Sequence, residues 1–175
     1  MVLPQEDLRT WHRQVDGTSY VCSTDPGIIQ PDRLNAAFAS DLLWWAKAMP
    51  EASLKKMVEN SLCFGLYVEQ SGPSGRGPSF EMVGFARVIT DHVTFAYLTD
   101  VYVLPQHQSK GLGKWLIDCL KELTGSWPEL RRLMLLTTEP STVKLYERTL
   151  GAKDVRESSP KIVVMEKIGP TGKSS

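Results

Sequence analysis

Apolar residues recur along the chain with two different periods, one typical of helices and one of strands. The clearest helical period has apolar side chains three and four positions apart, at Leu112, Trp115, Leu116, Cys119, Leu120 and Leu123. It predicts an amphipathic helix that stops near Thr124-Gly125. Weaker helical patterns, each of which begins at a polar residue or a proline, predict helices over 31–38, 41–49, 51–60 and 141–150.

Short runs of apolar, β-branched and aromatic residues predict strands over 19–24, 62–68, 82–89, 95–104, 132–138 and 162–168. Pro105 ends the fourth run, because proline has no N–H group for a continuing ladder. The Gly, Ser and Pro content of 71–79 predicts a mobile loop. Since strands and helices alternate, we expect an α/β fold, a mixed sheet with helices on both faces.

Length and charge limit the class of protein. The 175 residues are 42% hydrophobic, enough for one sizeable core, so we expect a single domain over 1–175 with its core over about 19–168 and a frayed tail at 169–175. Lysine plus arginine equals aspartate plus glutamate at 20 each, which argues against a broad nucleic-acid or membrane surface. The chain has no apolar run long enough to span a bilayer and no signal-peptide pattern, so we expect a cytoplasmic protein.

The cysteines and histidines do not indicate a metal site. Cys22, Cys63 and Cys119 are odd in number, far apart and embedded in apolar segments, so we interpret them as buried thiols. The three histidines are scattered, without the spacing of a zinc site. No metal is therefore expected.

Two glycine-rich stretches invite a phosphate-binding interpretation. The C-terminal GPTGKSS has the wrong spacing for a P-loop and no following helix. QSKGLG, at 108–113, instead lies between a predicted strand and a predicted helix. The first N–H groups of a helix lack partners within the helix and carry the positive end of its dipole, so they bind phosphate well. The alternative is an ordinary capped turn.

Two motifs together resemble a known family. The run LTDVYVLPQHQSKGLGKWL, at 98–116, resembles the acetyl-CoA signature of the GNAT superfamily of N-acetyltransferases. The run VKLYERTLGA, at 143–152, is similar to a later helix of that family, although it is one residue longer before Gly151 and has Ala152 where an aromatic residue is usual. The helix start at 138–141 also lacks the asparagine often found there. The resemblance covers most of the chain and implies the GNAT fold, a mixed, mainly antiparallel central sheet with helices on both faces.

The resemblance implies a cofactor, acetyl-CoA, and residues that bind it. The pantetheine arm would lie along the backbone of Val101, Tyr102 and Val103, one N–H of which would stabilise the oxyanion. The pyrophosphate would lie on the turn and helix start, formed by Gln108, Ser109, Lys110, Gly111, Leu112, Gly113 and Lys114. Tyr146 would protonate the departing thiolate, unless it is a packed aromatic residue only. For the base, Asp100, Tyr97 as a relay and a chain of waters all remain open.

The acceptor is less well defined. Trp44 and Trp45 lie in a region that selects acceptors in the family, and an indole face attracts ammonium, although at most one of them is expected to face a pocket and core packing is the other interpretation. We favour the primary amine of a small molecule, acetylated by direct attack in a ternary complex. The alternatives are a protein lysine or N-terminal acetyltransferase, a non-catalytic acetyl-CoA-binding module, or a module for another phosphate ligand. The oligomeric state, a homodimer included, stays open.

Overall fold

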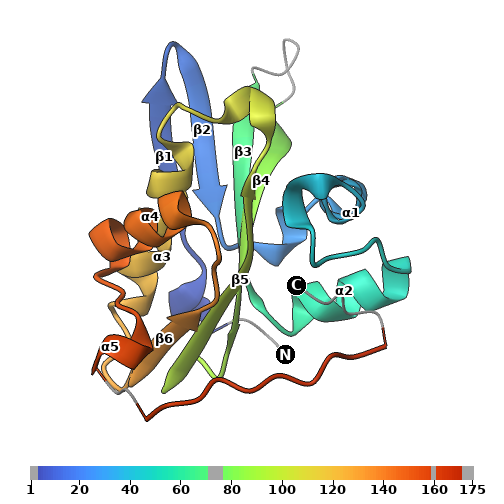
Figure 1. Ribbon diagram of the computed structural model, residues 1–175. Helices are drawn as coiled ribbons and strands as arrows, with labels where there is room; N and C mark the ends of the chain where they lie inside the picture. The colour runs from blue at the N-terminus through green and yellow to red at the C-terminus, as the bar shows by residue number, and fades with distance from the viewer. Residues whose placement is uncertain (1–3, 71–76, 159–160, 171–175) are drawn as a thin grey trace.

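A computed structural model describes residues 4–70, 77–158 and 161–170 (Figure 1). The expected frayed tail lies mostly outside the described residues, as does most of the expected loop at 71–79. The elements are η1 (Gln5–Asp7), β1 (Thr10–Val15), β2 (Thr18–Ser23), η2 (Pro26–Ile28), α1 (Pro31–Phe38), η3 (Asp41–Leu43), α2 (Glu51–Glu59), β3 (Leu62–Gln70), β4 (Ser79–Thr90), β5 (Phe95–Val103), η4 (Pro105–His107), α3 (Leu112–Thr124), β6 (Arg132–Leu135), α4 (Pro140–Leu150) and α5 (Val155–Ser158).

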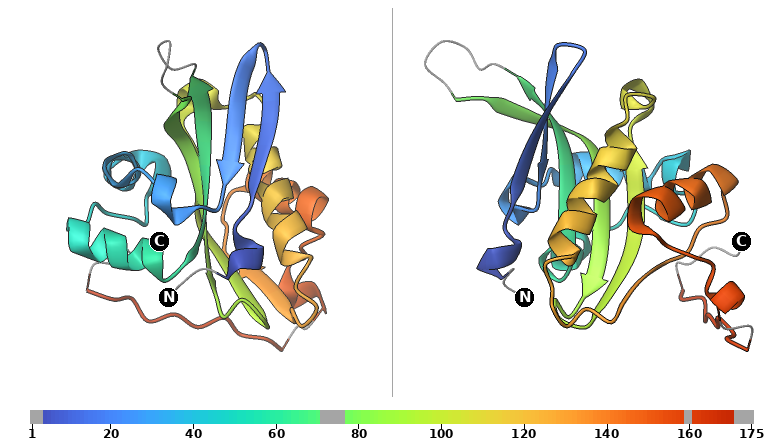
Figure 2. Two further views of the ribbon diagram at one scale, coloured as in Figure 1. Left: turned by 180° about the vertical axis from the view of Figure 1, so that it is seen from behind. Right: turned by 90° about the vertical axis from the view of Figure 1, so that its left-hand side faces the viewer.

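The strands form one sheet in the order β1-β2-β3-β4-β5-β6, antiparallel except for the parallel pair β5–β6. α3 and α4 cover one face of this sheet, and α1 and α2 cover the other (Figure 2). Each face has its own core. Phe64, Leu66 and Leu116 belong to the first, and Tyr67, Phe85 and Leu34 to the second. The expected mixed sheet between helices is confirmed.

The first strand was missed by the sequence analysis. β1 pairs with β2 from Thr10↔Ser23 to Val15↔Thr18, so the sheet begins well before residue 19. The hairpin turns at Asp16 and Gly17, whose φ angles of 49° and 76° suit a two-residue turn with both residues in the left-handed region. An Asp-Gly pair between β-prone residues was the available signal.

The helix expected over 41–49 is wrong. Only one turn forms, η3, where the Ser40 hydroxyl accepts a hydrogen bond from the Leu42 N–H at 3.3 Å. The Asn35 side chain then accepts a hydrogen bond from the Met49 N–H and donates one to the Met49 C=O, each at 2.9 Å. Pro50 also disfavours helical backbone at Met49. The polar groups of Met49 are therefore satisfied without a helix.

The strand expected over 162–168 is also wrong. This segment is extended but pairs with no strand of the described chain, and its apolar side chains are exposed, Met165 to 89%. It runs past the end of the sheet towards α2 (Figure 1). A β-prone run becomes a strand only where a neighbour takes up its backbone hydrogen bonds, and none does so here.

The three cysteines are free and buried, as predicted. Burial raises the pKa of the Cys63 thiol to about 12 and also raises that of Cys22. Both thiols are therefore protonated and unreactive at neutral pH. Among the described residues, no helix is long and apolar enough to cross a membrane.

Candidate functional site

The C-terminal half of β5 has a free backbone edge. β4 pairs with β5 along its length, whereas β6 pairs only with Phe95–Leu98 and ends at Leu135. Beyond this point β5 and β6 separate (Figure 1). Backbone groups of Val101, Tyr102 and Val103 on this side therefore have no strand partner within the described chain. An extended ligand that carries amide groups can pair with such an edge.

A β-bulge marks the start of this edge. Phe85 of β4 pairs with Tyr102 of β5, and Arg87 of β4 pairs with Thr99 of β5. The one residue between Phe85 and Arg87 therefore lies opposite two residues of β5, Asp100 and Val101. Asp100 has a φ of 53°, in the left-handed region that Asp enters more readily than most residues. The bulge turns the local backbone out of the regular ladder. It also directs the Asp100 side chain into a cluster of polar groups described below.

The turn after β5 exposes the start of α3. Gly111 caps the helix with a φ of 71° and provides no side-chain cap, while Ser109 has a φ of 61°. A Cβ at Gly113 would meet no atom within 4 Å, so the backbone there is open to a ligand. The first N–H groups of this 13-residue helix are thus available to an anion, and the helix dipole favours one. The turn predicted from the sequence therefore has the backbone geometry of a phosphate site.

The side chains of the turn have distinct roles. Gln108 donates to the Val103 carbonyl at 2.8 Å, which fixes the turn to β5. The Leu112 side chain is buried in the core, so only its backbone faces the turn. Lys110 lies 3.4 Å from the Tyr20 hydroxyl, and Lys114 forms an ion pair with Asp118 at 2.7 Å. The Lys114 charge is therefore partly neutralised within its own helix.

Arg13, on β1, is a further cation at this turn that the sequence analysis missed. Its Nη2 atom lies 3.8 Å from the position of a Cβ at Gly111, and its guanidinium lies over the Trp115 ring at 5.9 Å. It has no ion pair among the described residues, so its charge is available to a ligand. The sequence offered no local signal, because β1 reaches α3 only through the folding of the sheet.

We predict that Arg13→Gln raises the dissociation constant of acetyl-CoA about tenfold, since a charge-assisted contact with phosphate would be lost. Calorimetric titration at low and moderate salt would measure this. Lys114→Gln is the matched control, and its effect should be smaller, because Asp118 already pairs with that lysine. An unchanged dissociation constant in Arg13→Gln would contradict a phosphate-binding role for Arg13.

Tyr146 lies on α4 in the same core as Val103 and Leu112. The residue is 6% exposed, and burial raises the pKa of its phenol to about 12. Its hydroxyl has no hydrogen-bond partner in the described chain. Two other side-chain atoms there, Tyr67 Oη and His92 Nε2, lack a partner and are sealed from solvent, whereas the Tyr146 hydroxyl is not sealed. The phenol is therefore protonated at neutral pH and free to donate.

Asp100 is part of a buried polar cluster. Its Oδ2 accepts from Arg87 Nε at 2.7 Å, and its Oδ1 accepts from Trp45 Nε1 at 3.2 Å and Thr99 Oγ1 at 3.3 Å. The Arg87 side chain is 15% exposed and that of Asp100 is 7% exposed. Arg87, which the sequence analysis missed, also donates to Ser61 at 3.3 Å. Its only signal was a charge within an otherwise apolar strand.

The two tryptophans are not in the core. Trp44 and Trp45 are 42% and 40% exposed, and their rings meet edge to face at 5.6 Å. Trp45 lies at the site through its bond to Asp100, and Trp44 packs beside it. Tyr97, on β5, lies near the same carboxylate, and burial followed by the Asp100 charge raises the pKa of its phenol.

The chain matches proteins of one family. The family model described as "Acetyltransferase (GNAT) family" matches residues 37–152. A protein of Gibberella zeae named "Putative acetyltransferase FG08082" is 47% identical over 146 residues, which span 79% of this chain and 81% of that protein.

Solved structures agree with this assignment. A GNAT-family protein of Xanthomonas campestris pv. campestris (xcc2953) is 33% identical, with a TM-score of 0.63 over 87% of this chain and 94% of that one. The GNAT-family protein SP0256 of Streptococcus pneumoniae, at 18% identity, shares the fold with a TM-score of 0.54 over 93% and 98% of the two chains. The chain belongs to the GNAT family of acetyltransferases.

Proposed function

We propose that the protein transfers an acetyl group from acetyl-CoA to the primary amine of a small molecule, by direct attack in a ternary complex. One observation carries the proposal: the free edge of β5, the uncapped start of α3 and the unpartnered Tyr146 hydroxyl belong to one contiguous part of the fold. The edge suits the amides of a pantetheine arm, and the helix start suits a pyrophosphate. These two features fit acetyl-CoA better than a nucleotide that has no amide chain.

The residues would divide the binding of acetyl-CoA between them. Val101, Tyr102 and Val103 would pair with the amide groups through their backbone. The turn from Gln108 to Lys114, with Arg13, would hold the phosphates. Bound in this way, acetyl-CoA supplies an activated thioester, and a backbone N–H near the β5 bulge is the donor for the developing oxyanion.

Tyr146 is the proposed general acid, which donates its phenolic proton to the departing sulfur. A free thiol has a pKa near 8.5, well below the value of about 12 for this phenol. However, burial acts on sulfur as well, and within this protein it raises the pKa of the Cys63 thiol to about 12. A thiolate bound beside the buried Tyr146 would in the same way be a stronger base than a free thiolate, which narrows the difference in pKa between the phenol and the thiol.

Asp100 has a different proposed role. Both of its oxygens already accept hydrogen bonds, so we assign it to attract the acceptor ammonium and leave removal of the proton to water. Trp45 donates to the same carboxylate, and its exposed indole provides a surface on which a cation is stabilised. Tyr97 lies near enough to Asp100 to assist as a relay.

The experiment is continuous measurement of thiol release from acetyl-CoA with a panel of small amines, amino acids and short peptides. We expect turnover with small amines. Turnover with peptides alone would move the acceptor to proteins. Thermal-shift titration with CoA, ATP and NAD completes the test, because a ligand at 100 times its dissociation constant adds about 2.7 kcal/mol of stability. Equal stabilisation by ATP or NAD would overturn the assignment to acetyl-CoA and favour a site for another phosphate ligand.

A further inference from the structure

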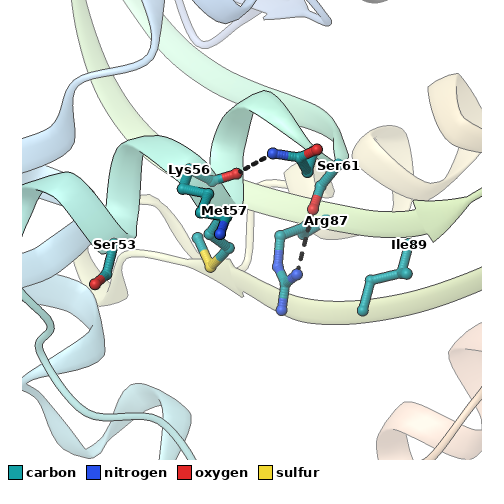
Figure 3. Close-up of a pocket in the computed structure, with 7 residues that line it drawn as sticks. Ser53, Lys56, Met57, Ser61, Arg87 and Ile89 are labelled. Atoms are coloured by element: carbon teal, nitrogen blue, oxygen red, sulfur yellow. Dashed lines mark hydrogen bonds between the residues drawn. The ribbon is translucent and has the colours of Figure 1, made fainter. Parts of the chain in front are cut away.

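A hollow of about 400 Å³ lies between α2 and β4, beside the Asp100 cluster (Figure 3). Its size falls within the usual range for small-ligand sites, about 300–1,000 Å³. The residues that line it are Ser53, Lys56, Met57, Asn60, Ser61, Arg87 and Ile89. Arg87 belongs both to this hollow and to the Asp100 cluster, so the hollow adjoins the proposed acetyl-transfer site.

The charges of this hollow favour a single negative charge. Among the described residues, Lys56 and Arg87 are the two cations that line it, and no carboxylate does so. Asp100 neutralises one of these charges through its ion pair with Arg87. Lys56 has no ion pair within the described chain. The hollow therefore has a net charge of about one positive unit, which suits a monoanion better than a phosphate dianion.

Hydrogen-bond donors also remain available there. Arg87 uses one guanidinium N–H for Asp100 and another for Ser61, and its other N–H groups have no partner among the described residues. The Ser61 hydroxyl lies on the wall (Figure 3). Asn60 also lines the hollow, and its side-chain amide donates one hydrogen bond to the Lys56 carbonyl at 2.8 Å. A guanidinium binds a carboxylate through charge-assisted hydrogen bonds, and the Lys56 ammonium adds a second positive charge.

Across Arg87, the site has the opposite preference. There the exposed indole of Trp45 attracts a cation and the Asp100 carboxylate is a further acceptor, although Arg87 balances its charge, whereas Lys56 and the outer N–H groups of Arg87 favour an anion. We propose that the acceptor is an amino acid, whose ammonium lies towards Asp100 and whose carboxylate lies in the hollow against Lys56 and Arg87. That this amino acid is acetylated rests on the proposed function, whereas the binding site for its carboxylate does not.

The test compares thiol release from acetyl-CoA with matched acceptors: alanine and leucine, their amides, and phosphoethanolamine. The amine of an amino-acid amide is less basic than that of the free amino acid, so a larger fraction of it is unprotonated at neutral pH. Intrinsic reactivity therefore favours the amides. We expect kcat/KM to be about tenfold or more higher for the acids, because only they retain the charge-assisted contact. In Lys56→Gln this preference should fall about tenfold, mainly through KM.

Lys55→Gln is the matched control, since Lys55 is on the same helix, loses the same charge and does not line the hollow. It should leave the preference unchanged. Thermal shift by alanine and leucine, measured without acetyl-CoA, provides a readout independent of turnover, and we expect Lys56→Gln to abolish it.

Three results would overturn the inference while acetyl transfer stands: equal use of acids and amides, no effect of Lys56→Gln, or preference for phosphoethanolamine. In contrast, Lys56-dependent thermal stabilisation by amino acids with no turnover on any amine would support the carboxylate site and overturn acetyl transfer.

Discussion

Tyr146→Phe is expected to lower kcat about 10²–10³-fold, within the range usual for loss of a general acid. The reason is that the phenol provides the only proton donor we assign to the departing sulfur. The affinity for acetyl-CoA should stay within about twofold of wild type, because the hydroxyl contributes no binding contact that we assign. Thiol release and calorimetric titration would measure the two quantities separately.

The pH dependence offers a second check on this role. Because burial raises the pKa of Tyr146 to about 12, its proton is retained below that pH, and donation is lost only as the pH rises through it. The kcat of the wild type should therefore show no decline due to this residue between about pH 8 and pH 10. A basic limb in kcat below about pH 10 that the phenylalanine variant lacks would support Tyr146 as the acid but would contradict its raised pKa.

Tyr67→Phe is the matched control for Tyr146→Phe. It removes the same atom from another buried tyrosine, whose hydroxyl has no partner among the residues that the structure describes, so activity should not change and stability should not fall. Comparable losses of kcat in both variants would show a packing effect rather than proton donation. Unchanged turnover in Tyr146→Phe would remove that residue from the mechanism.

Asp100→Asn is expected to reduce the free energy of unfolding by about 3 kcal/mol. Removing one partner of a buried ion pair costs roughly 3–5 kcal/mol, because the other charge stays buried and uncompensated, and the small exposure of Arg87 places the effect at the lower end. Asparagine tolerates the left-handed backbone at this position, so the change isolates the charge from backbone strain. Urea denaturation would measure the loss.

A double-mutant cycle separates the ion pair from other effects. Arg87→Met alone should also destabilise the protein, whereas Asp100→Asn with Arg87→Met should lose less than the sum of the single changes. Additive losses would mean that the two charges do not stabilise each other. A loss below about 1 kcal/mol in Asp100→Asn would place the pair among exposed salt bridges instead.

The long periodic elements were predictable because their signals are local. The stripe from Leu112 to Leu123 became α3, and Pro31–Phe38 became α1. The exposed helix start at Gly111 also follows from neighbouring residues, since glycine takes the left-handed backbone angle there without the strain of a side chain. In contrast, the expected helix over 41–49 failed because Asn35, distant in sequence, satisfies Met49.

The parts of the site that sequence analysis missed come from distant segments. Arg13 comes to Gly111 only when the β1–β2 hairpin joins the sheet, and neither residue indicates the other in the sequence. Trp45 meets Asp100 across 55 positions, and Arg87 meets Asp100 across 13. Such contacts depend on strand register and on a bulge, which no short pattern reports.

For this protein, the sequence by itself determined the family and predicted a turn suited to phosphate at 108–113 and a candidate acid, Tyr146, because these depend on residues close together along the chain. Only the tertiary structure decided the cation at the turn, the partners of Asp100 and the hollow with Lys56. The first arises where β1 comes to the start of α3, and the others where residues of α2, β4 and β5 come together. A meeting of distant segments is determined by packing and backbone pairing across the whole sheet.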